Sequence, residues 1–304
     1  MSDGVGCEEP AGGGGSESGE RSDLTRVVTC DLAFDVTESA EIAVQIGVAE
    51  SAGRVVTERF DVTTDGAPPA SFEEIRNPQG ERIHVMQADP GSLVIAYRAE
   101  IEHQPARSLA SSPSDTPEFP GASPGYERQL YLRPSRYCPS DHLIGFAVAE
   151  FGAGADIVSR VSTITEWIRK RISYVPGSSD VHDSAEHTLL TGMGTCRDFA
   201  HLGIALCRAT GIPARFVAVY APGLFPMDFH AVFETLQLGR WRVHDATGLA
   251  PRPSLVRIST GRDAADAAFS AVNSGVADLE SLEVSATVGG VLPHDDQSQI
   301  VELA

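Results

Sequence analysis

Several features that would narrow the function at once are missing from this 304-residue sequence. No apolar run approaches the roughly 18 residues that a helix needs to cross a bilayer. Basic residues are scarce, because 23 Lys and Arg stand against 42 Asp and Glu, which gives a formal charge of −19. This excess of negative charge disfavours nucleic acid and anionic lipid surfaces. We therefore expect neither nucleic acid nor a membrane as a partner.

Cysteine is also sparse, and its spacing disfavours both a structural zinc site and a framework of disulfides. The five cysteines are Cys7, Cys30, Cys138, Cys196 and Cys207. No two of them form a C-x-x-C pair, so we expect no structural zinc site. An odd, scattered set without an export signal argues against a disulfide framework, and Met1–Gly19 lack the basic and apolar regions of a signal peptide. A reducing, cytoplasmic location is therefore expected.

Composition divides the chain into five segments. Residues 1–24 are an acidic, glycine-rich tail expected to be disordered, residues 104–125 are a linker rich in Pro and Ser, and residues 293–304 are a C-terminal tail. Residues 25–103 hold strand-like runs separated by turn signals, which predicts a β-rich, sandwich-like domain. Residues 126–292 mix helical and strand patterns and hold the candidate catalytic residues.

A glycine-punctuated loop in the second domain runs into a helical pattern that begins at Cys196. The apolar stripe of this pattern comprises Phe199, Leu202, Leu206 and Ala209. A cysteine in the first turn lies near unpaired backbone N–H groups and the positive end of the helix dipole, and both favour the thiolate. On this segment alone, a nucleophile and a buried core cysteine are equally good interpretations. Upstream helices are predicted at Ser140–Phe151, Ala155–Ile172 and Ser184–Leu190.

The strands after this helix supply partners for the cysteine. We expect strands at Ala214–Tyr220, Phe229–Thr235 and Arg240–Ala246. If residues 236–239 form a four-residue hairpin loop, His230 lies opposite Asp245 on one face, with Cβ atoms about 5 Å apart. The carboxylate would orient the ring, and the other ring nitrogen would take the thiol proton. A different loop length would shift this register, and without Cys196 a plain surface His–Asp pair is the better interpretation.

Short motifs in this part of the chain occur in a characteristic combination. They are Gly194–His201, Gly211–Arg215, Asp228–Ala231 and Asp245–Thr247, with further segments at Leu132–Tyr137, Ser140–Asp141 and Gly261–Ala265. Together they resemble the transglutaminase-like superfamily, in particular its bacterial branch with an N-terminal β-rich domain. The resemblance implies an α+β, papain-like core of helices and antiparallel sheet. It also implies that Cys196 is the nucleophile, His230 the base and acid, and Asp245 the orienting carboxylate.

The same resemblance implies a reaction on a peptide or protein amide. The thiolate would form a thioester with a peptide or glutamine amide, which water or an amine would then resolve. Val232 stands where many members have tryptophan, and Ala246 stands where proline is frequent. The first departure leaves hydrolysis and transamidation open. We favour hydrolysis, with protein cross-linking as the alternative and a non-catalytic binding module as the rival class.

The remaining polar residues give weaker signals. The backbone N–H of Cys196 is the natural first donor to an oxyanion, and Tyr174 and His187 are candidates for the second by chain position only. Arg197 fits a structural and a substrate-facing role equally well. No cofactor and no metal are expected, because His182 and His187 lack the i, i+4 spacing of a helical metal site. The oligomeric state is left open.

Overall fold

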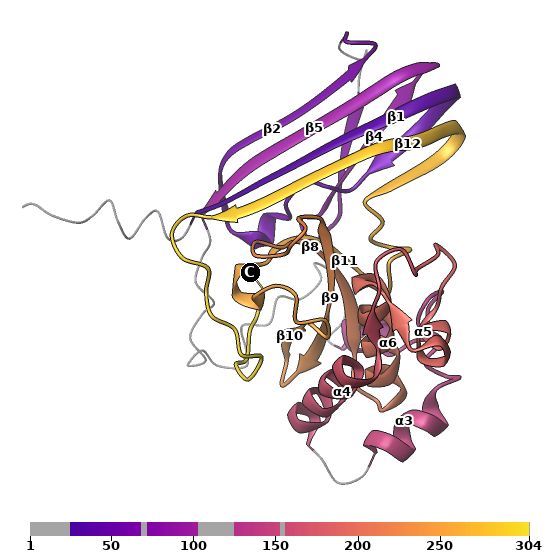
Figure 1. The fold of residues 1–304 in the computed structure, drawn as a ribbon, viewed down its shortest axis with the longest axis vertical. Helices are drawn as coiled ribbons and strands as arrows, with labels where there is room; N and C mark the ends of the chain where they lie inside the picture. The colour runs from indigo at the N-terminus through magenta and orange to yellow at the C-terminus, as the bar shows by residue number, and fades with distance from the viewer. Residues whose placement is uncertain (1–24, 68–71, 103–124, 153–155, 304) are drawn as a thin grey trace, which may run out of the picture.

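The structure, a computed structural model, describes residues 25–67, 72–102, 125–152 and 156–303. Figure 1 shows a large sheet of long strands at one end, a smaller sheet below it, and helices at the end away from the large sheet. The predicted N-terminal tail and all but the last residue of the predicted linker lie outside the described residues. The mixed architecture of helices and antiparallel sheets confirms the predicted α+β class.

The large sheet is antiparallel and has the order β2-β5-β1-β4-β3, with β12 paired to β1. Its strands are β1 (Thr25–Val44), β2 (Arg54–Thr64), β3 (Phe72–Arg76), β4 (Arg82–Ala88), β5 (Gly91–Glu102) and β12 (Ser270–Val288). Side chains in β1 alternate between buried and more exposed positions over much of the strand, as expected of a sheet with one covered face. The short helix η1 (Glu50–Ala52) precedes β2.

Strand β12 changes the boundary between the two predicted domains. The sequence analysis placed residues 270–288 with the catalytic region, but they pair with β1 from Arg26↔Val288 to Val44↔Ser270. Both β12 and β3 were missed from the sequence. In β12 most residues are exposed or only partly buried, so it carries little of the apolar signal that marks a strand.

The smaller sheet is antiparallel and has the order β10-β9-β8-β11. Its strands are β8 (Ala214–Tyr220), β9 (Phe229–Gln237), β10 (Arg240–His244) and β11 (Val256–Gly261). The helices are α2 (Tyr126–Leu130), α3 (Ile144–Phe151), α4 (Ile157–Arg171), α5 (Ala185–Thr191), α6 (Cys196–Ala209) and η2 (Arg252–Ser254). Among the described residues, no helix is long and apolar enough to cross a membrane.

Helix α6 is the central helix of this half and packs against β9. From Asp198 to Arg208 every residue of α6 is buried, and Phe199, Leu202 and Leu206 belong to the core shared with α4 and β9. Gly203 lets the two elements approach closely, because an added Cβ would lie 2.6 Å from the Phe233 ring. This contact holds the middle of α6 close against β9.

Two helix predictions need small corrections at their starts. Helix α3 begins at Ile144 rather than after Ser140, because residues 140–143 form a turn in which Leu143 N donates to Ser140 O at 3.2 Å. Helix α4 begins after Asp156, whose carboxylate caps the N–H groups of Val158 and Ser159. The starts of α5 and α6 agree with the predictions.

The β9–β10 hairpin has a shorter loop than the sequence analysis assumed, so the predicted register was wrong. Arg240 pairs with Gln237, which leaves a two-residue turn of Leu238 and Gly239 with φ of 52° and 78°. Positive φ at both positions is typical of a type I′ turn. The register shifts by two residues, and an even shift keeps every side chain on its predicted face. His230 and Asp245 therefore stay on one side as diagonal neighbours.

Candidate active site

Cys196 is the first residue of α6 and is partly exposed. The turn before it is held by Asp198, whose Oδ2 accepts hydrogen bonds from Thr195 N at 2.8 Å and Thr195 Oγ1 at 3.1 Å. The N–H of a first helical residue has no partner within its helix. The start of α6 therefore offers a sulfur atom and a free backbone donor at one place.

His230 on β9 and Asp245 just after β10 form a buried pair. Their side chains are completely buried, and His230 Nε2 lies 3.1 Å from Asp245 Oδ2. The other ring nitrogen, Nδ1, is buried without a hydrogen-bond partner among the described residues. With Nε2 engaged by the carboxylate, Nδ1 is the nitrogen left to exchange a proton with another group.

The electrostatics place Cys196 beside this pair. Burial alone would lower the pKa of His230, but the charge and hydrogen bond of Asp245, followed by those of Cys196, outweigh it and raise the pKa to about 10. Because Asp245 engages Nε2, Nδ1 is the ring nitrogen through which His230 can exchange a proton with Cys196. The imidazolium is thus favoured at neutral pH between a carboxylate and a thiol.

Asp245 is held in place by groups that the sequence analysis did not single out. Its Oδ1 accepts hydrogen bonds from Thr247 N at 2.8 Å and Thr247 Oγ1 at 2.7 Å, and its backbone O accepts from Arg169 Nη2 at 2.7 Å. Burial raises the pKa of Asp245, but His230 and Thr247 outweigh it and lower the pKa. The Asp-x-Thr spacing was a readable signal for Thr247, whereas nothing local in the sequence points to Arg169 on α4.

The other described cysteines are buried and free. Burial raises the pKa values of Cys30, Cys138 and Cys207 to about 12, so their thiols stay protonated at neutral pH. Cys207 lies in the core around α6. Cys196 differs from all three in being partly exposed and next to a charged pair.

Several polar residues near the motif have structural partners. Arg197 donates to Ser179 Oγ at 3.0 Å and to the carbonyl of Asp180, and it lies over the Tyr137 ring, which ties the preceding loop to α6. His201 Nε2 accepts a hydrogen bond from Ala264 N at 3.1 Å in the core. These contacts assign both residues to support of the fold around Cys196.

Two further histidines lie apart from the His230–Asp245 pair. His244 turns to the opposite face of β10, where its Nε2 pairs with Thr235 Oγ1 at 2.9 Å. His187 on α5 lies 3.6 Å from Asp183. Within the described ranges no group of three or more His, Cys, Asp or Glu side chains is placed to hold a metal ion.

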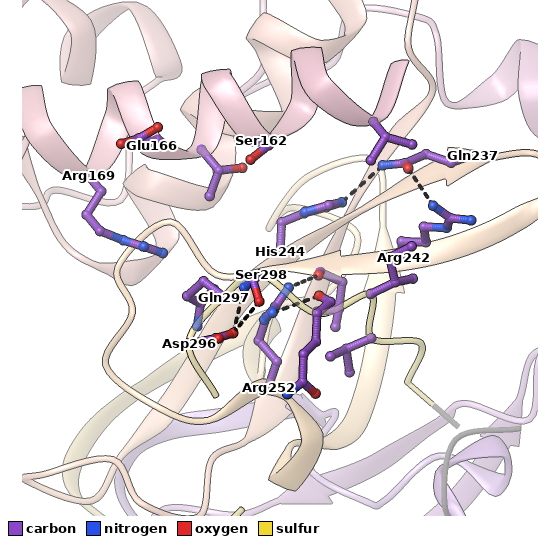
Figure 2. A pocket seen from close by; sticks show the side chains of 16 residues that line it. Ser162, Glu166, Arg169, Gln237, Arg242, His244, Arg252, Asp296, Gln297 and Ser298 are labelled. Carbon is purple, nitrogen blue, oxygen red and sulfur yellow. Dashed lines mark hydrogen bonds between the residues drawn. The ribbon is translucent and has the colours of Figure 1, made fainter. Parts of the chain in front are cut away.

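A polar cavity of about 360 Å³ lies behind Asp245, between α4, the β9–β10 hairpin and residues 296–301. Figure 2 shows Arg169 and Ser162 on one side and His244 and Arg242 on the other. Cys196, His230 and Asp245 do not line this cavity. The cavity adjoins the back of the site through Arg169 and is not the cleft in which the thiol could act.

The predicted C-terminal tail forms part of the wall of this cavity and is packed in the described residues up to Leu303. Val243 N donates to Val301 O at 2.9 Å, so this segment lies along β10. Arg252 holds it through Asp295, with N···O distances of 2.8 Å and 2.9 Å. The sheet edge next to Asp245 is thereby covered.

Comparison with known proteins identifies the family of this chain. Residues 147–246 match the profile of the family described as "Transglutaminase-like superfamily". A crystal structure from Cytophaga hutchinsonii, described as a candidate cysteine protease, is 33% identical, with a TM-score of 0.78 over 92% of this chain and 95% of that one. This chain belongs to the transglutaminase-like superfamily.

Other similarities of this transglutaminase-like protein are weaker. An uncharacterised protein of Mycobacterium leprae is 28% identical over 148 residues, which is 45% of this chain and 52% of that protein. The chain thus matches about half the length of that relative. The periplasmic domain of TgpA from Pseudomonas aeruginosa is 17% identical, with a TM-score of 0.37 over 70% of this chain and 91% of that one.

Proposed function

We propose that this protein is a cysteine-dependent enzyme that acts on a peptide or glutamine amide through a thioester on Cys196. The proposal is supported above all by the 3.1 Å pairing of His230 Nε2 with Asp245 Oδ2 beside the first residue of α6. A histidine with one nitrogen bonded to a buried carboxylate and the other free is the partner that a nucleophilic thiol requires. The three residues would act as nucleophile, proton carrier and orienting carboxylate.

Before acylation the thiol proton is transferred to His230 Nδ1, as the raised pKa of the ring favours, and the sulfur then attacks the carbonyl carbon of the amide as a thiolate. A C–S bond forms while the carbonyl π electrons move to oxygen. When the tetrahedral intermediate collapses, the C–N bond breaks and the nitrogen leaves as ammonia or an amine with the proton from Nδ1. Asp245 stays ionised throughout, since its pKa is lowered by its partners.

In the second step, water gives a proton to His230 and attacks the thioester carbonyl, and the C–S bond breaks as the sulfur leaves as a thiolate beside the protonated ring. We favour this hydrolysis because Cys196 is partly exposed and water therefore reaches the thioester. A primary amine in place of water would give a new amide, which is the cross-linking alternative. Both outcomes share the acylation step and the same three residues.

Thiol labelling tests the nucleophile. At pH 7, iodoacetamide followed by peptide mapping should modify Cys196 at least ~10-fold faster than Cys138 or Cys207, because Cys196, unlike these two, is accessible and lies near a histidine. Cys196→Ala should abolish turnover, and Asp245→Asn should reduce it by about 10³–10⁴-fold by misorienting the ring. Turnover that survives in Cys196→Ala would sink the proposal. A thiol that reacts no faster than the buried ones would favour a non-catalytic binding module.

The products identify the acceptor. The protein is incubated with a peptide library, with and without an added primary amine, and the products are weighed. Exchange of ammonia for water means deamidation, peptide fragments mean proteolysis, and incorporation of the amine means transamidation. Incorporation as the main product, with little hydrolysis in water alone, would replace hydrolysis by cross-linking.

The cytoplasmic location expected from the sequence stays a prediction. It is supported by the four described cysteines, which are all free, since a reactive thiol is best preserved where disulfides do not form. Fractionation of the native cells with an antibody against the protein tests it. Recovery outside the cytoplasm would contradict it.

A further inference from the structure

The proposed reaction, on which this inference rests, develops negative charge on the carbonyl oxygen. Such an oxyanion is stabilised by preorganised donors about 3 Å away, and one donor is rarely enough. The N–H of Cys196 at the start of α6 supplies one. A second donor must reach the same oxygen, from an element next to the first turn of α6.

Strand β6 (Ser173–Tyr174) is such an element. It runs parallel to β7 (Met193–Gly194), and Tyr174 pairs with Gly194, two residues before Cys196. The backbone ladder is formed by Ser173 N to Gly192 O at 2.8 Å and Val175 N to Gly194 O at 3.0 Å. The backbone of Tyr174 is therefore fixed relative to the loop that carries the nucleophile.

The side chain of Tyr174 is directed to the start of α6. Paired residues of parallel strands share a face, and on that face an added Cβ at Gly194 would lie 2.6 Å from the Asp198 Cβ. The Tyr174 ring lies on the same helix turn, with its centroid 6.0 Å from that of Phe199. The missing side chain at Gly194 is what lets the first turn of α6 come this close to β7.

The charged groups around the phenol include those of the candidate site. Burial first, and then Cys196, Asp228, Asp245 and Asp198, raise the pKa of Tyr174 to about 12. The hydroxyl therefore stays protonated, as a donor, throughout the neutral range. It makes no hydrogen bond to the described residues, and Tyr174 is 40% exposed, so a substrate can reach it.

His187, the other candidate for the second donor, is not held beside the start of α6 by such a strand pairing. His187 lies on α5 and half of its side chain is exposed, with Nε2 3.6 Å from Asp183. We propose that the Tyr174 hydroxyl is the second donor of the oxyanion hole and acts together with the backbone N–H of Cys196. It donates to the carbonyl oxygen as the C–S bond forms and releases it when the C–N bond breaks.

Two reagents distinguish a role of Tyr174 in the oxyanion hole from an effect of Tyr174 on the reactivity of the Cys196 thiol. Acylation of Cys196 by p-nitrophenyl acetate passes through an oxyanion, whereas alkylation by iodoacetamide does not. Tyr174→Phe keeps the ring against Phe199 and removes only the hydroxyl. We expect the Cys196-dependent acylation burst to fall about 10²-fold, with the alkylation rate changed less than ~2-fold and the melting temperature retained.

Tyr126→Phe, at an exposed tyrosine on α2, is the matched control and should leave both rates unchanged. An unchanged burst in Tyr174→Phe would overturn the role of Tyr174 while leaving the proposed function intact. Equal losses in both reactions would also overturn it, because the hydroxyl would then act on the thiol. A wild-type protein with no burst above Cys196→Ala would instead remove the proposed function and this inference with it.

Discussion

Arg169 Nη2 donates a 2.7 Å hydrogen bond to the backbone carbonyl of Asp245, although the two residues are 76 positions apart. Helix α4 thereby holds the turn that follows β10. The guanidinium also lies against that turn, because an added Cβ at Gly248 would be 3.4 Å from Arg169 Nε. The orientation of the His230 ring thus depends on a helix that contributes no reacting group.

We therefore expect Arg169→Met to lower the acylation rate of Cys196 by about tenfold or more, because small displacements of a catalytic group are costly. Arg171→Met, two residues along the same helix, is the control and should act like wild type. The measurement is the p-nitrophenyl acetate burst together with the melting temperature. Equal bursts in the two variants would show that Arg169 does not position Asp245.

Stability should fall as the pH drops below about 6.5, in part because of His201. Its side chain is fully buried, and burial, followed by the charges of Arg197 and Arg208, lowers its pKa well below the usual value. Protonation would also turn Nε2 into a donor that faces the N–H of Ala264. As the pH falls, the unfolded chain therefore binds a proton at His201 that the folded chain does not bind, and the free energy of unfolding decreases.

The loss from this one group should approach about 1.4 kcal/mol per pH unit below pH 6.5. His201→Gln keeps an acceptor for Ala264 N but cannot be protonated, so its stability should depend less on pH between 7 and 5. Urea unfolding of both proteins at several pH values measures the difference. Parallel pH dependences would contradict the assignment to His201.

Gly203→Ala should destabilise the protein although alanine favours helices. The added Cβ would meet the Phe233 ring at 2.6 Å in a core without room to adjust. Overpacking of this kind costs about 1–3 kcal/mol, against about 1 kcal/mol gained from helix propensity. Adding Phe233→Leu should recover part of the loss, and additive effects in the double mutant would argue against a direct clash.

Leu238→Asn should stabilise the β9–β10 hairpin by about 0.5–1 kcal/mol. Leu238 is 77% exposed and has φ of 52°, a conformation that asparagine tolerates better than leucine. The Asn-Gly pair that results is the preferred type I′ turn. Thermal unfolding measures the change, with Gln237→Asn as a neighbouring control that should not stabilise; a lower melting temperature for Leu238→Asn would contradict the turn assignment.

The core of the site was readable from the sequence because its signals are local. The helix start at Cys196 follows from a glycine-rich loop and a 3- to 4-residue apolar spacing, and the faces of His230 and Asp245 follow from the period of two. The register was misjudged because leucine rarely occupies a left-handed turn position, which made Leu238–Gly239 look like part of a longer loop. An error of two residues in the register leaves His230 and Asp245 on the same face of the sheet. An error of one residue would have placed them on opposite faces.

Other parts could not be predicted because they depend on contacts between distant segments. Arg169 reaches Asp245 through the packing of α4 on the small sheet, which no local pattern encodes. Strand β12 carries few buried residues and gains its structure from pairing with β1. Tyr174 could be named only by chain position, and the two-residue ladder with β7 is what places it beside Cys196.

The pairing of β1 with β12 also governs how the chain can fold. Thr29 and Ser285, whose hydroxyls lie 2.7 Å apart, are separated by 256 residues. During synthesis, one edge of β1 therefore stays unpaired until residues 270–288 have left the ribosome, and contacts of such long range make folding slow. Truncation after β11 would leave that edge open to other chains. Strand β12, which the sequence analysis missed, covers this edge when it pairs with β1.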